Sequence, residues 1–62
     1  MLTGNVYTHK DGTEWECKVV YGRATARLMR VKDKFTLLAH DIVFDSDGKF
    51  EWCYSTGGFF DE

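Results

Sequence analysis

The most regular alternation of apolar and polar residues in the chain lies between residues 13 and 21. Every second position there is apolar, and the residues between are mostly charged. The apolar residues are Trp15, Cys17, Val19 and Tyr21. A period of two is typical of a β-strand with one face toward solvent, so we predict a strand over Thr13–Tyr21 with those four residues on one face. The preceding segment, His9–Gly12, ends in Asp-Gly, which favours a tight turn. We therefore expect Leu2–Thr8 to pair with Thr13–Tyr21 as a hairpin.

A second hairpin is indicated near the end of the chain. The segment Asp45–Gly48 is rich in turn formers, and short apolar runs flank it on both sides. We predict that Ile42–Phe44 pairs with Lys49–Tyr54. In the latter strand Phe50, Trp52 and Tyr54 share one face.

The middle of the chain can be interpreted in two ways. Polar breaks at Tyr21–Arg23 and Lys32–Lys34 isolate Ala24–Val31, which contains good helix formers with some helical spacing. Eight residues without a clear N-cap are short for a helix, so we favour a strand. We expect Phe35–Phe44 to be the next strand, with a bulge or bend, because its apolar residues lie on both faces.

These elements predict one small all-β domain spanning residues 1–62. Five antiparallel strands in sequence order form a meander, which we expect to curl into a half-open barrel resembling SH3-like barrels. A helix over 24–31 would instead make the fold α+β. We expect residues 57–62 to form a short aromatic and acidic tail. The chain has no proline, so its strand edges need charge, closure or a partner for protection, and a homodimer is one predicted solution.

Composition narrows the class of protein. With 44% hydrophobic and 16% aromatic residues the chain is too apolar for intrinsic disorder, yet no apolar run approaches the ~18 residues of a membrane span. The first residues lack the features of a secretory signal, so we expect a cytoplasmic protein without a membrane partner. In that compartment Cys17 and Cys53 are expected to be buried thiols rather than a disulfide.

No pattern in the sequence predicts catalysis or a cofactor. The residues His9, Cys17, His40 and Cys53 lack the close spacing of structural zinc ligands, and 45–48 lacks the ligand pattern of a calcium loop. His40 and Asp41 are adjacent and would point to opposite faces of a strand. We therefore predict that the protein is not an enzyme and carries neither a metal nor another cofactor.

The net charge of −2 conceals a polarised distribution. Residues 18–34 carry a charge of +5, residues 41–62 carry −5 and residues 1–17 carry −2. Neighbouring strands of opposite charge would simply neutralise each other. Alternatively, the basic segment would bind single-stranded RNA or DNA through Arg23, Arg27, Arg30, Lys32 and Lys34. The acidic total charge disfavours nucleic acid.

The function that these observations favour is binding of a larger protein. Candidate contacts are aromatic and acidic residues near the C-terminus: Trp52, Tyr54, Phe59, Phe60, Asp61 and Glu62. In size and composition alone, the chain resembles the small regulators and inhibitors of bacteria, phages and mobile elements, which occlude a surface of a larger partner. Binding of single-stranded nucleic acid is the first alternative, and a structural subunit of a homo-oligomer is the second.

Overall fold

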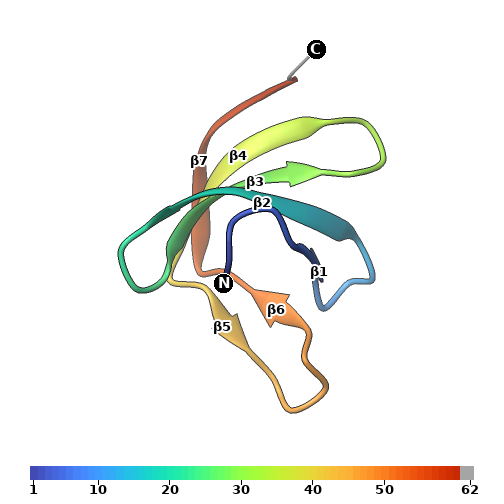
Figure 1. The fold of residues 1–62 in the computed structure, drawn as a ribbon, viewed down its shortest axis with the longest axis vertical. Helices are drawn as coiled ribbons and strands as arrows, with labels where there is room; N and C mark the ends of the chain where they lie inside the picture. Colours follow the sequence, from blue (N-terminus) through green and yellow to red (C-terminus); the bar gives the residue numbers. More distant parts are fainter. Residues whose placement is uncertain (61–62) are drawn as a thin grey trace.

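A computed structural model describes residues 1–60 and shows an all-β protein based on one five-stranded antiparallel sheet (Figure 1). The sheet has the order β1-β2-β3-β4-β7, with a two-stranded hairpin, β5-β6, inserted between β4 and β7. The strands are β1 (Val6–Thr8), β2 (Glu14–Tyr21), β3 (Thr25–Arg30), β4 (Phe35–His40), β5 (Val43–Phe44), β6 (Phe50–Glu51) and β7 (Tyr54–Phe60). The predicted antiparallel meander is confirmed, and the middle element is a strand rather than a helix.

The sheet is curled, and closure into a barrel is not confirmed (Figure 1). Within residues 1–60, β1 and β7 are its two edges and do not pair with each other. A bridge between His9 and Phe50 instead ties the β1–β2 turn to β6. The structure is therefore a curled sheet with a hairpin against one face.

Three turns are organised by aspartate side chains, as the turn residues in the sequence predict. The Asp11 carboxylate accepts a hydrogen bond from the Thr13 backbone N–H at 2.8 Å, and the Asp33 carboxylate accepts one from Phe35 N–H at 3.1 Å. Asp45 Oδ1 accepts bonds from two backbone N–H groups at 2.9 and 3.0 Å. Aspartate closes such turns because its short side chain reaches the backbone two residues ahead.

A β-bulge at the middle of β2 corrects the predicted face of that strand. Cys17 lies opposite Leu28 and Val19 lies opposite Arg27, so Lys18 is the extra residue. Because opposite residues share a face, the bulge places Val20, and neither Val19 nor Tyr21, on the side of Trp15 and Cys17. The prediction that Trp15, Cys17, Val19 and Tyr21 share one face is therefore wrong beyond Cys17.

The predicted strands Leu2–Thr8 and Phe35–Phe44 are both too long. The first begins only at Val6. The second ends at His40, because Asp41 has a positive φ of 59° and turns the chain out of the sheet before β5. The bend expected in this segment is confirmed, and it separates two strands that belong to different sheets.

The C-terminal part differs most from the prediction. The second hairpin exists, with Val43 opposite Glu51 and Phe44 opposite Phe50, but its last strand ends at Glu51 rather than at Tyr54. The fifth strand of the main sheet is β7, which pairs with β4. The expected tail over 57–62 is wrong for residues 57–60, which lie within this strand.

The core lies between the sheet and the β5–β6 hairpin. Its buried residues are Trp15, Cys17, Ala26, Leu28, Leu37, Ala39 and Phe50, and every strand of the sheet from β2 to β4 contributes. Phe50 comes from the hairpin and is fully buried. The hairpin therefore covers the face of the sheet that carries the core.

The two cysteines are free thiols in different surroundings. Cys17 is buried in the core, which raises the pKa of its thiol, as desolvation disfavours the thiolate. Cys53 is exposed, so the prediction that both thiols are buried is wrong for Cys53. Within residues 1–60 no helix is long and apolar enough to cross a membrane.

Candidate protein-binding edge

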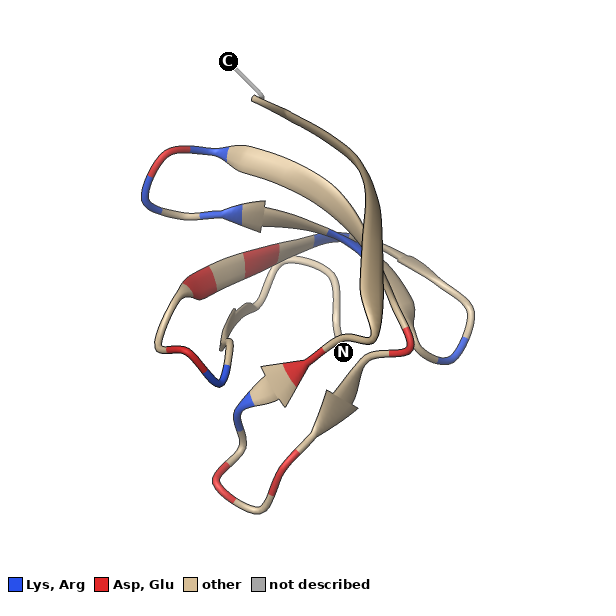
Figure 2. Cartoon of the chain, turned by 180° about the vertical axis from the view of Figure 1, so that it is seen from behind, with Lys and Arg blue, Asp and Glu red and all other residues tan. Residues whose placement is uncertain are grey.

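Strand β7 is the long, open edge of the sheet. One side of β7 pairs with β4, no strand of the described chain lies on its other side, and all seven of its residues are exposed. Neither β7 nor β4 contains a lysine, arginine, aspartate or glutamate, and Figure 2 shows β7 without a charged position. An uncharged edge strand of this length is a template for a further strand.

Strand β7 presents different side chains on its two faces. Tyr54 lies opposite His40 and Thr56 opposite Leu38, on the face away from the core, whereas Ser55 lies opposite the buried Ala39. A second bulge opposite Leu37 gives β7 an extra residue, so Phe59 joins Thr36 on the outer face and Phe60 joins Phe35 on the inner face. Phe59 and Phe60 therefore point to opposite faces of the sheet.

His40 fixes the first half of β7. Its imidazole stacks on the Tyr54 ring at 4.4 Å between centroids and 10° between planes. The same ring lies 3.0 Å, from Nε2 to Oγ1, from the Thr56 hydroxyl. These two contacts hold an aromatic ring and a hydroxyl in place on an edge that remains open.

Phe35 fixes the second half of β7. Its ring lies against Gly58 so closely that a Cβ there would come within 2.5 Å of Phe35 Cζ. It also contacts the Phe60 ring edge-on at 5.0 Å. Gly57, with a positive φ of 63°, supplies the backbone bend of the bulge. Gly57 and Gly58 are therefore a packed part of the strand.

The structure brings together three of the six predicted protein-binding residues. Tyr54, Phe59 and Phe60 lie on β7 and are 53%, 45% and 63% exposed. Trp52 lies elsewhere, half-buried between Trp15 and His9 at 5.4 and 4.7 Å between ring centroids. Trp52 therefore packs against the core, and the predicted Asp61 and Glu62 lie outside the described residues.

Sequence reasoning missed the polar and glycine positions of the edge. Ser55, Thr56, Gly57 and Gly58 form the centre of β7, and His40 orients its first residues. The available signal was the absence of charge from residue 52 to residue 60, between Glu51 and Asp61. The glycine pair obscured this signal because glycines in sequence favour a break.

The predicted nucleic-acid residues do not form one patch. Arg23 lies in the β2–β3 turn, Arg27 lies on β3, and Lys32 and Lys34 lie in the β3–β4 turn, at the far end of β3 (Figure 2). At a rise of about 3.3 Å per residue, the six residues of β3 separate these turns by roughly 20 Å.

Arg30 is engaged within the protein. Its guanidinium donates two hydrogen bonds to the Asp33 carboxylate, at 2.9 and 2.7 Å, and lies over the rings of Trp15 and Phe35 at 5.6 and 5.2 Å. These hydrogen bonds lower the pKa of Asp33 to about 2 and raise the pKa of Arg30. To bind a phosphate, Arg30 would have to break its hydrogen bonds to Asp33 and leave the rings of Trp15 and Phe35.

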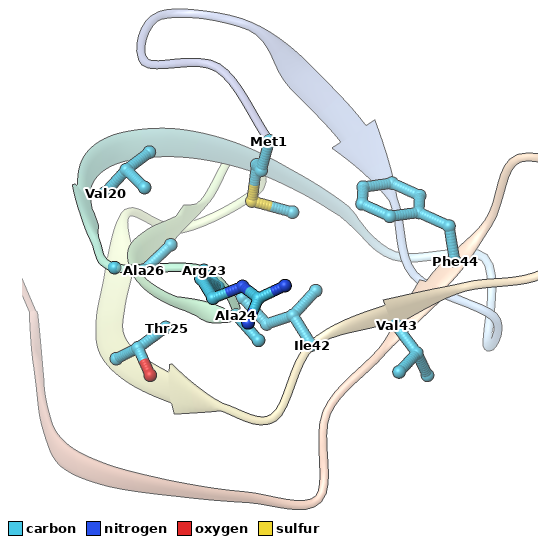
Figure 3. A pocket seen from close by; sticks show the side chains of 10 residues that line it. Met1, Val20, Arg23, Ala24, Thr25, Ala26, Ile42, Val43 and Phe44 are labelled. Atoms are coloured by element: carbon cyan, nitrogen blue, oxygen red, sulfur yellow. The ribbon is translucent and has the colours of Figure 1, made fainter.

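A cavity of 230 Å³ opens beside the β2–β3 turn (Figure 3). Most of its lining residues are of apolar type, among them Met1, Val20, Ile42 and Phe44, and within residues 1–60 Arg23 supplies its one charged side chain. Val20 reaches this cavity because of the bulge at Lys18. The volume is below the ~300 Å³ at which small-molecule sites usually begin.

Residues 1–60 contain no group of three or more histidine, cysteine, aspartate or glutamate side chains arranged to hold a metal ion. No family model, curated protein or solved structure matches the chain.

Proposed function

We propose that the protein is a non-catalytic binding module that accepts an extended segment of a partner protein as an added strand along β7. The observation that carries this proposal is the exposure of all seven residues of an uncharged edge strand. Backbone N–H and C=O groups on the open side of such a strand pair readily with a second extended chain.

Side chains on β7 supply the selectivity that backbone pairing lacks. The outer face offers Tyr54, Thr56 and Phe59, and the inner face offers Ser55 and Phe60. Aromatic residues favour aromatic and β-branched neighbours across strands. We therefore expect the partner segment to be rich in such residues, to lack proline, and to carry little charge where it meets β7.

The role that fits this mode is that of a small regulator or inhibitor. A chain of 62 residues that captures a strand of a larger protein prevents that strand from pairing elsewhere. Affinity then comes from main-chain hydrogen bonds and from burial of the exposed aromatic rings.

Selection from a displayed library of random peptides tests the proposal. We expect enrichment of extended apolar sequences, and we expect the amide signals of β7 to shift most in NMR titrations with the selected peptides. N-methylation of alternate peptide bonds in a selected peptide should abolish binding, because it removes strand hydrogen bonds while the side chains remain.

Two matched variants locate the site. Thr56→Lys places a charge on the β7 edge, whereas Val6→Lys places the same charge on β1, where Val6 is 51% exposed. We expect the first to weaken peptide binding by at least about tenfold and the second to leave it unchanged. Equal effects of the two variants, or selected peptides that shift signals away from β7, would contradict the proposal.

A further inference from the structure

The geometry of β7 points to a second copy of this chain as the occupant of the edge when no partner segment is bound. We infer that two copies pair antiparallel through β7, and that this dimer masks the binding site. The inference rests on the proposed function for its regulatory part. The dimer itself follows from the structure of β7.

The strand is complementary to itself in the antiparallel direction. Aromatic residues stand at both of its ends, Tyr54 at the start and Phe59 and Phe60 at the finish, with small residues between them. An antiparallel copy therefore places each aromatic end beside an aromatic end of the other copy. The small central residues let the two backbones approach.

Charge does not oppose this pairing. Neither β7 nor its neighbour β4 carries a lysine, arginine, aspartate or glutamate, so self-pairing brings no like charges together within these two strands. Proline is absent as well, so every residue of β7 retains its N–H group. Two of the devices that commonly prevent edge-to-edge pairing, charged residues and proline, are missing from this strand.

The other edge of the sheet limits the assembly to two copies. Strand β1 has three residues, and the chain just after it bonds to β6 through Lys10 N–H to Phe50 O at 2.9 Å. Each copy thus offers one long open edge. Pairing of identical edges about a two-fold axis gives a closed dimer rather than a fibre.

Masking follows because the dimer and the partner segment use the same backbone groups. Only the monomer is competent to bind, so the apparent dissociation constant for the partner rises as the fraction of monomer falls. At low protein concentration the module binds tightly, and at high concentration it protects its own edge.

Sedimentation equilibrium at concentrations from about 5 to about 500 µM tests the dimer with the complete chain and without any ligand. We expect a monomer–dimer equilibrium for the natural sequence and for Val6→Lys. For Thr56→Lys we expect the dissociation constant of the dimer to rise at least about tenfold, because two lysines then meet near the two-fold axis. Circular dichroism verifies that each variant is folded.

An NMR sample that mixes labelled and unlabelled protein locates the contact. Intermolecular nuclear Overhauser effects between Tyr54 of one copy and Phe59 or Phe60 of the other are expected. A monomer at every concentration, or a dimer that Val6→Lys weakens more than Thr56→Lys does, would overturn the inference.

Peptides selected as above separate this inference from the proposed function. If a selected peptide binds β7 and leaves the dimer intact, the masking is wrong and strand addition at β7 stands. If the dimer forms through β7 and no peptide competes with it, the proposed function fails and the dimer remains.

Discussion

Strands β1 and β7 form the two edges of one sheet, and the short edge is tied to another part of the chain whereas the long edge is open. β1 has three residues, and just after it the backbone N–H of Lys10 donates to Phe50 O of β6 at 2.9 Å. β7 has seven residues, and within residues 1–60 no strand lies on its outer side.

The two edges differ because residues between β4 and β7 form a hairpin that packs on the core near β1. Residues 41–53 leave the sheet after β4 to build the hairpin that supplies Phe50 to the core and reaches the β1 side. The same excursion brings the chain back beside β4 as β7, and no strand within residues 1–60 lies on the outer side of β7. The insertion thus ties down the chain next to the β1 edge and leaves the β7 edge open.

The largest expected effect comes from removing the ring that anchors the β5–β6 hairpin in the core. Phe50→Ala removes a fully buried ring, which typically lowers the free energy of unfolding by about 3–5 kcal/mol. For a domain of this length, that loss is comparable with the total stability of roughly 3–9 kcal/mol. Urea denaturation should therefore find the unfolding midpoint of the variant shifted strongly toward zero denaturant.

Phe44→Ala is the matched control for Phe50→Ala. Phe44 lies opposite Phe50 in the same hairpin but is 45% exposed. We expect it to cost less than about 2 kcal/mol, because much of its ring remains in water. Similar losses for the two variants would show that the hairpin does not act through Phe50.

The next effect concerns the packing of β7 on β4. Gly58→Ala places a methyl group 2.5 Å from Phe35 Cζ, so the ring has to move, and we expect a loss of about 1–3 kcal/mol in the free energy of unfolding. Ser55→Ala, on the same strand and exposed, should stay within about 0.5 kcal/mol.

A second substitution decides whether the contact with Phe35 is the cause. Phe35→Leu shortens the side chain, so in the Gly58→Ala background it should restore part of the lost stability. Denaturation of the two single variants and the double variant measures this coupling. Additive losses would refute a steric origin.

The two cysteines differ in how far the fold protects them. Cys17 on β2 is fully buried in the core, and Cys53 is exposed just before β7. We expect iodoacetamide to modify Cys53 at least about a hundredfold faster, since Cys17 reacts only when the structure opens. Mass spectrometry of peptides follows both rates, and comparable rates would contradict the burial of Cys17 in the core.

The smallest effect is a pH dependence at the turn that supports Phe35. The folded pKa of Asp33 is lowered from 3.8 to about 2 by its hydrogen bonds from Arg30. The ionised form is therefore favoured on folding, and its contribution is present above about pH 4 and is lost as the pH falls toward 2. Denaturation midpoints of the natural protein and of Asp33→Asn should converge across this range, and a constant difference would exclude the linkage.

Local patterns predicted the sheet because most turns and strands here are encoded by neighbouring residues. Asp11-Gly12 and Asp47-Gly48 mark two turns that the structure contains, and the alternation before Lys18 gives the buried face of β2. The bulge at Lys18 and the strand through Gly57–Gly58 depend on contacts between strands. No local pattern reports such contacts.

Part of the candidate site could be predicted from residue type alone. Tyr54, Phe59 and Phe60 could be identified because exposed aromatic rings are common at binding surfaces. Trp52 has the same chemistry in sequence, and only the packing of Trp15 and His9 around it separates it from the edge.

The bridge between His9 and Phe50 also bears on the order in which the chain folds. The hairpins that join β1 to β4 connect neighbours in sequence, whereas this bridge closes a loop of about forty residues. Non-local closure is the slow part of folding for small β proteins. We therefore expect the chain beside β1 to stay untied until this bridge forms, with both edges of the sheet able to mispair during that period.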